Sequence, residues 1–107
     1  MANLDRIFHA LSDPTRRAVI ERLRDGGASV SELAQPFDMA LPSFLKHLGV
    51  LERAGLIESD KQGRTRHCHL ADGALVPVSA WMADQRALWE GRTDRLAAFV
   101  EQKDANP

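Results

Sequence analysis

The period of the apolar residues changes twice along this chain, and the resulting order of helices, hairpin and helix limits the folds that it can adopt. Up to residue 54, apolar residues recur every three to four positions, as in amphipathic helices. Residues 56–60 and 64–70 alternate instead, and the three residues 61–63 that connect them include a glycine, which indicates a β-hairpin. The helical period returns near Val76 and continues to about residue 101. The sequence therefore predicts a mainly α fold with one small hairpin.

Four helices are expected before the hairpin, and local signals mark where they begin. Asp13 and Pro14 suit the start of the second helix, because aspartate caps unpaired N–H groups and proline lacks the N–H that the first turn leaves unpaired. Ser29 and Glu32 have the spacing of a capping box at the start of the third. We expect the four helices at residues 3–11, 14–24, 30–36 and 41–54.

The third and fourth helices and the hairpin form the most informative part of the chain. A short helix and a tight connection that hold a longer helix at a fixed angle make a helix-turn-helix, and a basic hairpin directly after it makes a wing. Such a helix fits the DNA major groove, and a hairpin tip can reach the neighbouring groove or the phosphates. We expect residues 1–107 to be a single winged helix-turn-helix domain, with the helix-turn-helix at about 30–54, the wing at about 56–70 and a final helix at about 76–101.

The fourth helix is expected to have an apolar and a polar face. Its inward stripe should comprise Leu41, Phe44, Leu45, Leu48 and Leu51. The opposite face offers hydroxyl, imidazole and basic side chains, which suit the edges of DNA bases and the phosphates. The hairpin adds three more basic side chains. The candidate DNA-contacting residues are Ser43, Lys46, His47, Arg53, Lys61, Arg64 and Arg66. A plain solvated helix and turn is the alternative for each, and strand alternation places Arg66 on the face of Cys68.

The charge of the chain is a mild argument against nucleic-acid binding. The formal net charge is −1, whereas a nucleic-acid binder is expected to be basic where it meets phosphate. Residues 40–70 hold five Lys and Arg against three Asp and Glu, and residues 71–107 hold four against six. The middle of the chain is thus net positive and its end net negative, which permits a basic face without requiring one.

Several short stretches, taken in order, resemble one protein family. They are Leu11–Arg17 (LSDPTRR), Ser31–Ala34 (SELA), Lys46–Leu48 (KHL) with Leu51, Ala54–Ile57 (AGLI) and Gly63-Arg64. Together they resemble the ArsR family of bacterial winged helix-turn-helix repressors over about residues 4–70. The final helix, with Trp81, Trp89 and Arg92 among its residues, resembles a branch of that family that does not sense metals. The resemblance implies a homodimer whose two recognition helices read a pseudo-palindromic DNA site.

Three positions of the fourth helix depart from the family's usual residues. Ala40 stands where a serine N-cap is common, Leu45 where serine is common and Gly49 where lysine is common. Loss of a serine cap costs a helix about 1 kcal/mol, and an internal glycine costs about as much relative to alanine. Fewer polar groups remain to read bases, although Leu41 and Leu45, where exposed, can press on thymine methyl groups.

The sequence predicts no metal site and no cofactor. Metal-sensing members of the family carry cysteines in a stretch that corresponds to Ser29–Leu33 here, where hydroxyls, which are poor ligands for soft metals, replace both thiols. A second family site uses Asp and His pairs on the last helix, but residues 76–102 contain no histidine. His67 and His69 could share a metal as a weak candidate site, but Cys68 points the other way and structural zinc needs about four ligands.

The resemblance also implies that the first and last helices form the dimer interface. The last helix carries more large apolar side chains than a small domain is expected to cover, and such patches usually mark interfaces. The expected interface residues are Leu4, Phe8, Trp81, Leu88, Trp89, Leu96 and Phe99. Packing of these side chains within their own domain is the alternative. A small-molecule effector, if there is one, is expected at this interface, and no residue identifies it.

Two other classes of function compete with a DNA-binding regulator. A winged helix can instead bind a partner protein, which the near-neutral charge and the apolar start of the fourth helix favour. An enzyme is not expected, because the sequence has no glycine-rich phosphate loop and no nucleophile with a plausible base. A single cysteine, no signal-peptide pattern and no long apolar run predict a cytoplasmic protein without a membrane segment.

Overall fold

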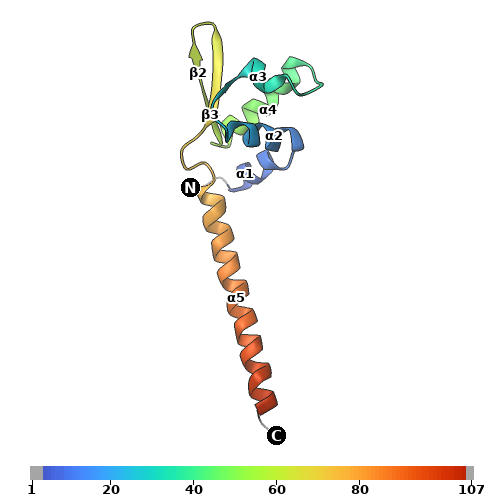
Figure 1. Cartoon of the computed structure of the whole chain (residues 1–107), viewed down its shortest axis with the longest axis vertical. Coiled ribbons are helices and arrows are strands. Elements are labelled where there is room, and N and C mark those ends of the chain that lie inside the picture. The colour runs from blue at the N-terminus through green and yellow to red at the C-terminus, as the bar shows by residue number, and fades with distance from the viewer. Residues whose placement is uncertain (1–3, 106–107) are drawn as a thin grey trace. The chain divides into compact units, whose positions relative to one another are not determined.

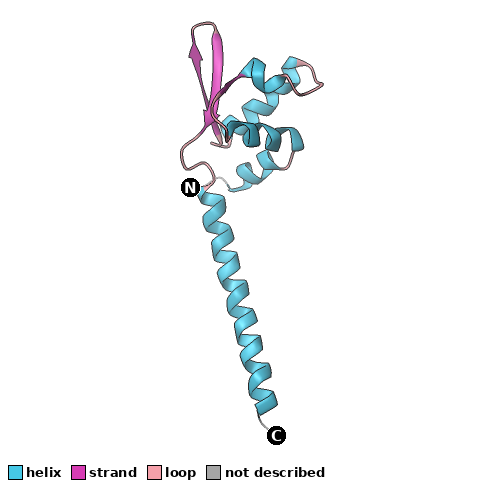
Figure 2. Ribbon diagram, viewed as in Figure 1, coloured by secondary structure: helices cyan, strands magenta, loops and turns pink. Residues whose placement is uncertain are grey.

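The computed structural model describes residues 4–105, and the chain divides after Pro77 into two compact units. The first unit holds short helices and a small sheet, which Figure 2 shows in magenta, and the second consists of the rest of one long helix (Figure 1). The elements are α1 (Leu4–Leu11), α2 (Pro14–Leu23), β1 (Ala28–Ser29), α3 (Val30–Ala34), α4 (Leu41–Arg53), β2 (Ile57–Gln62), β3 (Thr65–Leu70) and α5 (Val76–Ala105). This confirms the predicted fold class. Within residues 4–105, no helix has both the length and the apolar character needed to cross a membrane.

The caps of α2 and α3 form as the sequence predicts. The Asp13 carboxylate accepts a hydrogen bond of 3.1 Å from the Arg16 N–H, with Pro14 in the first turn. At α3, the Glu32 N–H donates to the Ser29 hydroxyl over 3.1 Å, and the Ser29 N–H donates to the Glu32 carboxylate over 3.3 Å. These bonds satisfy N–H groups that a helix start leaves unpaired, so both starts are fixed by local sequence.

A short strand, β1, was not expected from the sequence. Its two residues pair with β3, so that Ala28 lies opposite Cys68 and Ser29 opposite His67, and the sheet has the order β1-β3-β2. Gly27, which precedes β1, lies close to the backbone of β3, because a Cβ atom on Gly27 would lie 3.1 Å from the Cys68 carbonyl oxygen. Two residues are too few to show a period of two, so only the tertiary pairing defines this strand.

The hairpin turn lies further along the chain than the predicted connection at residues 61–63. Gln62 pairs with Thr65, so Gly63 and Arg64 alone connect β2 to β3. Gly63 has a φ of 65°, and a two-residue hairpin loop favours glycine at such a position because a Cβ atom would be strained there. The expected three-residue connection is therefore wrong, and Arg64 lies at the tip of the wing.

The core of the first unit forms where α1, α2, α3 and α4 meet the sheet. Its buried apolar residues are Ile7, Ala10, Val19, Ile20, Leu23, Ala28, Leu33, Phe44, Leu48, Leu51, Ala54, Leu56, Ile57 and Cys68. The expected inward stripe of α4 is too wide, since Leu41 is 54% and Leu45 39% exposed. The buried positions follow i, i+4 and i+7 from Phe44, and Leu45 lies about 100° around the helix from Phe44, which places it on a flank.

Helix α5 is 30 residues long and carries large apolar side chains on its surface. Trp81 is 44%, Leu88 66%, Trp89 68%, Leu96 64% and Phe99 60% exposed. At about 100° per residue, these side chains fall within roughly a third of the helix circumference, interrupted by Gln85 and Arg92. The second unit contains no further described element that could cover this stripe.

Candidate nucleic-acid interface

The helix-turn-helix consists of α3, a connection over residues 35–40 and α4. An aromatic contact holds the connection against α4, because the rings of Phe37 and Phe44 stack with their centroids 5.5 Å apart. At the other end of α3, hydrogen bonds from the backbone and side chain of Ser29 lower the pKa of Glu32, which keeps the capping carboxylate ionised. Both ends of the short helix are thus fixed, and with them the angle at which α4 leaves the connection.

The outer face of α4 presents a mixture of polar and apolar side chains. Ser43 and Lys46 are exposed, as predicted, and the exposed Leu41 and Leu45 accompany them. Ala40 gives the helix no side-chain cap, and its carbonyl oxygen instead accepts the Ser43 and Phe44 N–H groups, each over 3.1 Å. The start of the helix can therefore offer a hydroxyl, a basic group and methyl groups to a neighbouring molecule.

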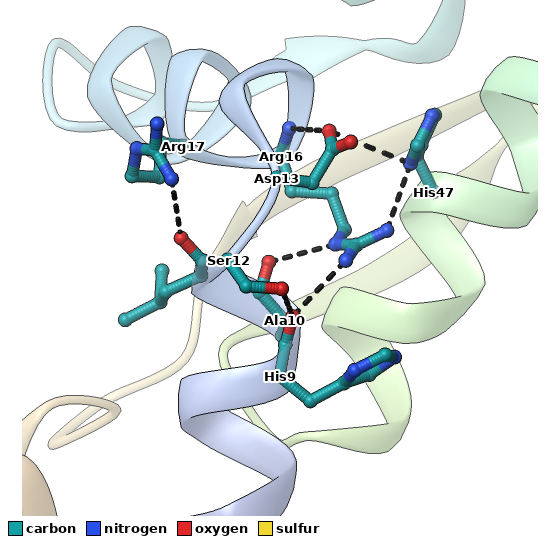
Figure 3. Close-up of polar contacts among 8 residues, drawn as sticks. His9, Ala10, Ser12, Asp13, Arg16, Arg17 and His47 are labelled. Carbon is teal, nitrogen blue, oxygen red and sulfur yellow. Dashed lines mark hydrogen bonds and ion pairs between the residues drawn. The ribbon is translucent and has the colours of Figure 1, made fainter.

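His47 differs from its neighbours because it is tied into the protein (Figure 3). Its Nδ1 lies 3.0 Å from Nη1 of Arg16 and 3.8 Å from Oδ2 of Asp13, and its side chain is 22% exposed. Arg16 is itself buried, and it also donates to the carbonyl oxygens of His9 and Ala10. The sequence identified Asp13 as a cap. It gave no sign that Arg16 reaches α4, because Arg16 and His47 are 31 positions apart.

The Asp13 carboxyl is kept in its ionised form at this junction. Burial opposes ionisation, but the hydrogen bond from the Arg16 N–H and the positive charges of His47 at acid pH and of Arg16 outweigh it and lower the pKa of Asp13 from 3.8. The negative charge also complements the positive end of α2. Asp13 thus caps one helix and offsets the charge of the guanidinium that contacts another.

A polar cluster joins the wing to α4. Nη2 of Arg66 lies 2.5 Å from Oε1 of Glu52, and the Ser59 hydroxyl donates to the same carboxylate oxygen over 2.6 Å. Nε of Arg66 donates to the Ser59 hydroxyl over 3.0 Å, which closes a triangle between α4, β2 and β3. Arg66 therefore has an internal partner, as its predicted place on the Cys68 face suggests, whereas neither Glu52 nor Ser59 was identified from the sequence.

The remaining predicted wing bases, Lys61 and Arg64, lie at the end of the hairpin, and both are exposed. Lys61 is opposite Arg66 in the register, and Arg64 is in the turn. Among the ion pairs of the described residues, none includes Lys61, Arg64 or Lys46. These cations are therefore available to an anionic partner.

The three consecutive residues His67, Cys68 and His69 point to different surroundings. Nε2 of His69 lies 3.2 Å from the Glu58 carboxylate, and His67 is half-buried. Cys68 is buried, and burial raises the pKa of its thiol. Within the described part of the chain, no three His, Cys, Asp or Glu side chains are grouped so that they could hold a metal ion.

A groove between α1 and the end of α4 was also missed by the sequence analysis. It has a volume of about 340 Å³ and is lined by Arg6, His9, Val50, Arg53 and Ala54. Arg53 folds over Gly49, since a Cβ atom on that glycine would lie 3.1 Å from Nη1 of Arg53. Arg53 is thus exposed as predicted, but it faces this groove beside two other basic groups.

Comparison with known proteins gives consistent results over most of the chain. The model of a helix-turn-helix domain family matches residues 11–60. The chain is 41% identical over 99 residues to the HTH-type transcriptional regulator Rv2034 of Mycobacterium tuberculosis, covering 92% of this chain and 90% of that protein. It is 30% identical over 79 residues to the transcriptional repressor SdpR of Bacillus subtilis, covering 74% and 88%.

A solved structure agrees with these relatives. The crystal structure of an ArsR family transcriptional regulator is 57% identical to this chain, with a TM-score of 0.78, and the match covers 81% of this chain and 90% of that one. The helix-turn-helix and the hairpin that follows it are thus the DNA-binding fold of transcriptional regulators, as the sequence predicted. The chain belongs to the ArsR family of winged helix-turn-helix transcriptional regulators.

Proposed function

We propose that this regulator binds a pseudo-palindromic DNA site as a homodimer and represses transcription there. The observation that carries the proposal is the exposure of Ser43 and Lys46 on the outer face of α4, followed by a wing whose tip presents Lys61 and Arg64. A helix of this kind enters the major groove with the residues of its first turns near base edges. The wing bases then lie where a hairpin tip meets phosphates.

The predicted contact residues divide into two groups on the basis of their partners. Ser43, Lys46, Lys61 and Arg64 are exposed and suit direct contact with bases or phosphates. His47, Arg53 and Arg66 each have part of the side chain engaged by the protein or directed to the groove beside α1, so only their remaining polar atoms are available to DNA. Leu41 and Leu45 add apolar contacts of the kind that thymine methyl groups accept.

The homodimer part of the proposal is supported by the apolar stripe on α5. Exposed side chains of this size seldom remain uncovered in a soluble protein, and a second copy offers an identical stripe. From α1, Phe8 is 42% exposed and Leu4 is half-buried, so both can contribute. Two-fold symmetry would place two recognition helices on half-sites about one helical turn of DNA apart.

Repression is the sign of regulation that we infer, because one relative is named a transcriptional repressor. A dimer that covers a promoter excludes polymerase without further machinery. Because the partner is chromosomal DNA, we place the protein in the cytoplasm. An effector would act by changing the dimer, and a hollow of about 290 Å³ on α5, lined by Gln85, Leu88, Trp89, Arg92 and Arg95, is the candidate place.

A titration by fluorescence anisotropy tests the DNA-binding part. The purified protein is titrated against duplexes that cover the DNA upstream of its own gene and against a scrambled duplex, at several salt concentrations. We expect tighter binding to the native duplex and a log–log salt slope of about −0.9 for each phosphate contacted. Lys46→Ala and Arg64→Ala should weaken binding. Arg24→Ala, which removes an exposed basic side chain outside α4 and the wing, should not.

The same titration addresses the rival function. If neither duplex binds at low salt while the protein remains folded, the scaffold does not act as a regulator of its own gene. The exposed Leu41 and Leu45 would then favour a protein partner. Equal weakening by Lys46→Ala and Arg24→Ala would also contradict the proposed interface, since it would indicate only a response to total charge.

A further inference from the structure

We propose that Arg16 holds His47 as the neutral tautomer protonated at Nε2, and so makes His47 a hydrogen-bond donor toward DNA. The donor role rests on the proposed function, whereas the choice of tautomer does not. Arg16 is a positioning residue in this proposal, because it acts on DNA only through His47.

The Arg16 guanidinium is fixed before it meets His47. Its Nε donates to the Ala10 carbonyl oxygen over 2.7 Å, and its Nη2 donates to the His9 carbonyl oxygen over 3.0 Å. Both carbonyls belong to the last turn of α1, where a helix leaves its acceptors unpaired. Arg16 is also only 8% exposed, so the plane of the guanidinium and the direction of Nη1 are set by the end of α1.

The contact between Arg16 and His47 then decides where the imidazole proton lies. Nη1 of Arg16 is 3.0 Å from Nδ1 of His47 (Figure 3). Arginine has only donors and does not lose its proton in proteins, so Nδ1 must be the acceptor. A neutral imidazole has one donor and one acceptor nitrogen, which places the proton on Nε2.

Asp13 does not compete for the same nitrogen. Its Oδ2 is 3.8 Å from Nδ1, which is longer than a hydrogen bond, and that oxygen already accepts the Arg16 N–H. Its negative charge instead lies beside the guanidinium and offsets it. A proton on Nδ1 would face the guanidinium at close range and would have no acceptor within hydrogen-bond distance in this cluster.

The donor nitrogen lies on the side of the ring away from this cluster. Figure 3 shows Nε2 of His47 directed away from both Asp13 and Arg16. The side chain is partly exposed, and His47 follows Lys46 on the helix that we place in the major groove. An Nε2–H there fits acceptors such as phosphate oxygens, guanine O6 and N7 or thymine O4, and it disfavours the amino groups of cytosine and adenine.

The tautomer can be measured without DNA. Long-range ¹⁵N–¹H correlation spectra of the free protein at pH 8, where histidines are ordinarily neutral, distinguish protonated from unprotonated ring nitrogens. His47 is assigned by the signals that are lost in His47→Gln. We expect an unprotonated Nδ1 and a protonated Nε2 in the wild type, and a mixture of tautomers in Arg16→Lys. A protonated Nδ1 in the wild type would overturn the proposal.

Two variants then test the donor role, because their amides match different ring nitrogens. Glutamine places its NH₂ near the position of Nε2, whereas asparagine places its polar group near Nδ1. We expect His47→Gln to keep DNA affinity within about threefold and His47→Asn to lose about tenfold, the size of one good hydrogen bond to an anionic acceptor. If His47 only supports Arg16, the order should reverse, because asparagine keeps an acceptor for the guanidinium.

Lys46→Ala separates failure of this proposal from failure of the proposed function. If the wild type binds DNA and Lys46→Ala weakens it, but the two His47 variants bind alike, the donor role is wrong and the regulator remains. If the wild type binds no duplex, the proposed function and the donor role fail together, and the ¹⁵N spectra still decide the tautomer. Thermal melting of each variant checks that a change in affinity is not caused by unfolding.

Discussion

Glu52 on α4 and Arg66 on β3 form an ion pair whose Oε1 and Nη2 atoms are 2.5 Å apart, and Ser59 on β2 hydrogen-bonds to both side chains. The wing is therefore fastened to the recognition helix by side chains as well as by the chain connection. The pair engages Arg66, which the sequence analysis assigned to DNA contact. Arg66 therefore helps to hold the wing in position, whereas Lys61 and Arg64 supply its exposed positive charge.

We expect a double-mutant cycle on Glu52→Gln and Arg66→Gln to give a coupling free energy of about 0.5–1 kcal/mol, because the pair is partly exposed and screened by solvent. Urea denaturation gives the free energies of unfolding. The His69 and Glu58 pair, which is more exposed on the carboxylate side, is the matched control and should couple less. Equal coupling in the two cycles would contradict the anchoring role.

Ala40→Ser should stabilise the first unit by about 1 kcal/mol, because the backbone of Ala40 already has the extended conformation of an N-cap and lacks only the side-chain acceptor. The free energy of unfolding in urea measures the effect. Ser29→Ala, which removes a cap that is present, should destabilise by a similar amount. An unchanged midpoint in Ala40→Ser would mean that the N–H groups at the start of α4 already have other acceptors.

The Asp13 carboxylate should make stability depend on pH in the acid range. Its pKa is lowered below 3.8 in the folded protein, so its contribution is fully present above that value and is lost as pH falls through the lower folded pKa. Asn caps a helix nearly as well but cannot titrate, so Asp13→Asn isolates the charge. The difference in unfolding free energy between wild type and Asp13→Asn should shrink below pH 4, and a constant difference would exclude a role for the charge.

Cys68 should react slowly with thiol reagents while the protein is folded. Burial raises the pKa of the thiol, which lowers the fraction of the reactive thiolate at neutral pH, and the side chain is also covered. With a chromogenic disulfide reagent, we expect little reaction in buffer and release of one equivalent in denaturant, since the chain has one cysteine. Rapid reaction in buffer would show that β3 opens.

Leu88→Glu should separate a dimer into monomers without unfolding the chain, because Leu88 is 66% exposed on α5 and contributes little to the core. Sedimentation velocity gives the mass in solution, and circular dichroism checks the helix content. Ala87→Glu introduces the same charge at the preceding residue, about 100° around the helix and away from the apolar stripe, and should remain dimeric. A monomeric wild type would contradict the proposed assembly.

The sequence predicts the elements well where local signals define them. The caps at Asp13 and Ser29 mark helix starts that the structure has, and the alternation after Gly55 marks the hairpin. The sequence did not predict β1, because two residues are too few to show a period. Its strand character comes from pairing with Cys68 and His67. Leu45 was placed inside because periodicity gives the direction of a stripe but not its width, which packing decides.

For the candidate site, residue type predicts exposure better than it predicts partners. Lys46, Lys61 and Arg64 are exposed as expected, since lysine and arginine are seldom buried without a partner. The partners of His47 and Arg66 could not be read from the sequence, because Arg16 and Glu52 are distant in sequence and carry no signal of their own. A lone arginine and a lone glutamate are ordinarily surface residues.

Ser29 ends β1, lies opposite His67 of the wing and caps α3, all without an intervening residue. A displacement at the base of the hairpin is therefore transmitted directly to the first turn of the helix-turn-helix. In the proposed dimer, each protomer should consequently bind its half of the DNA site as one rigid unit. The distance between the contacts of α4 in the groove and those of the wing is then fixed within the protomer. Any tolerance for different spacing between the two halves of a site must then come from parts of the protein outside the helix-turn-helix and the wing.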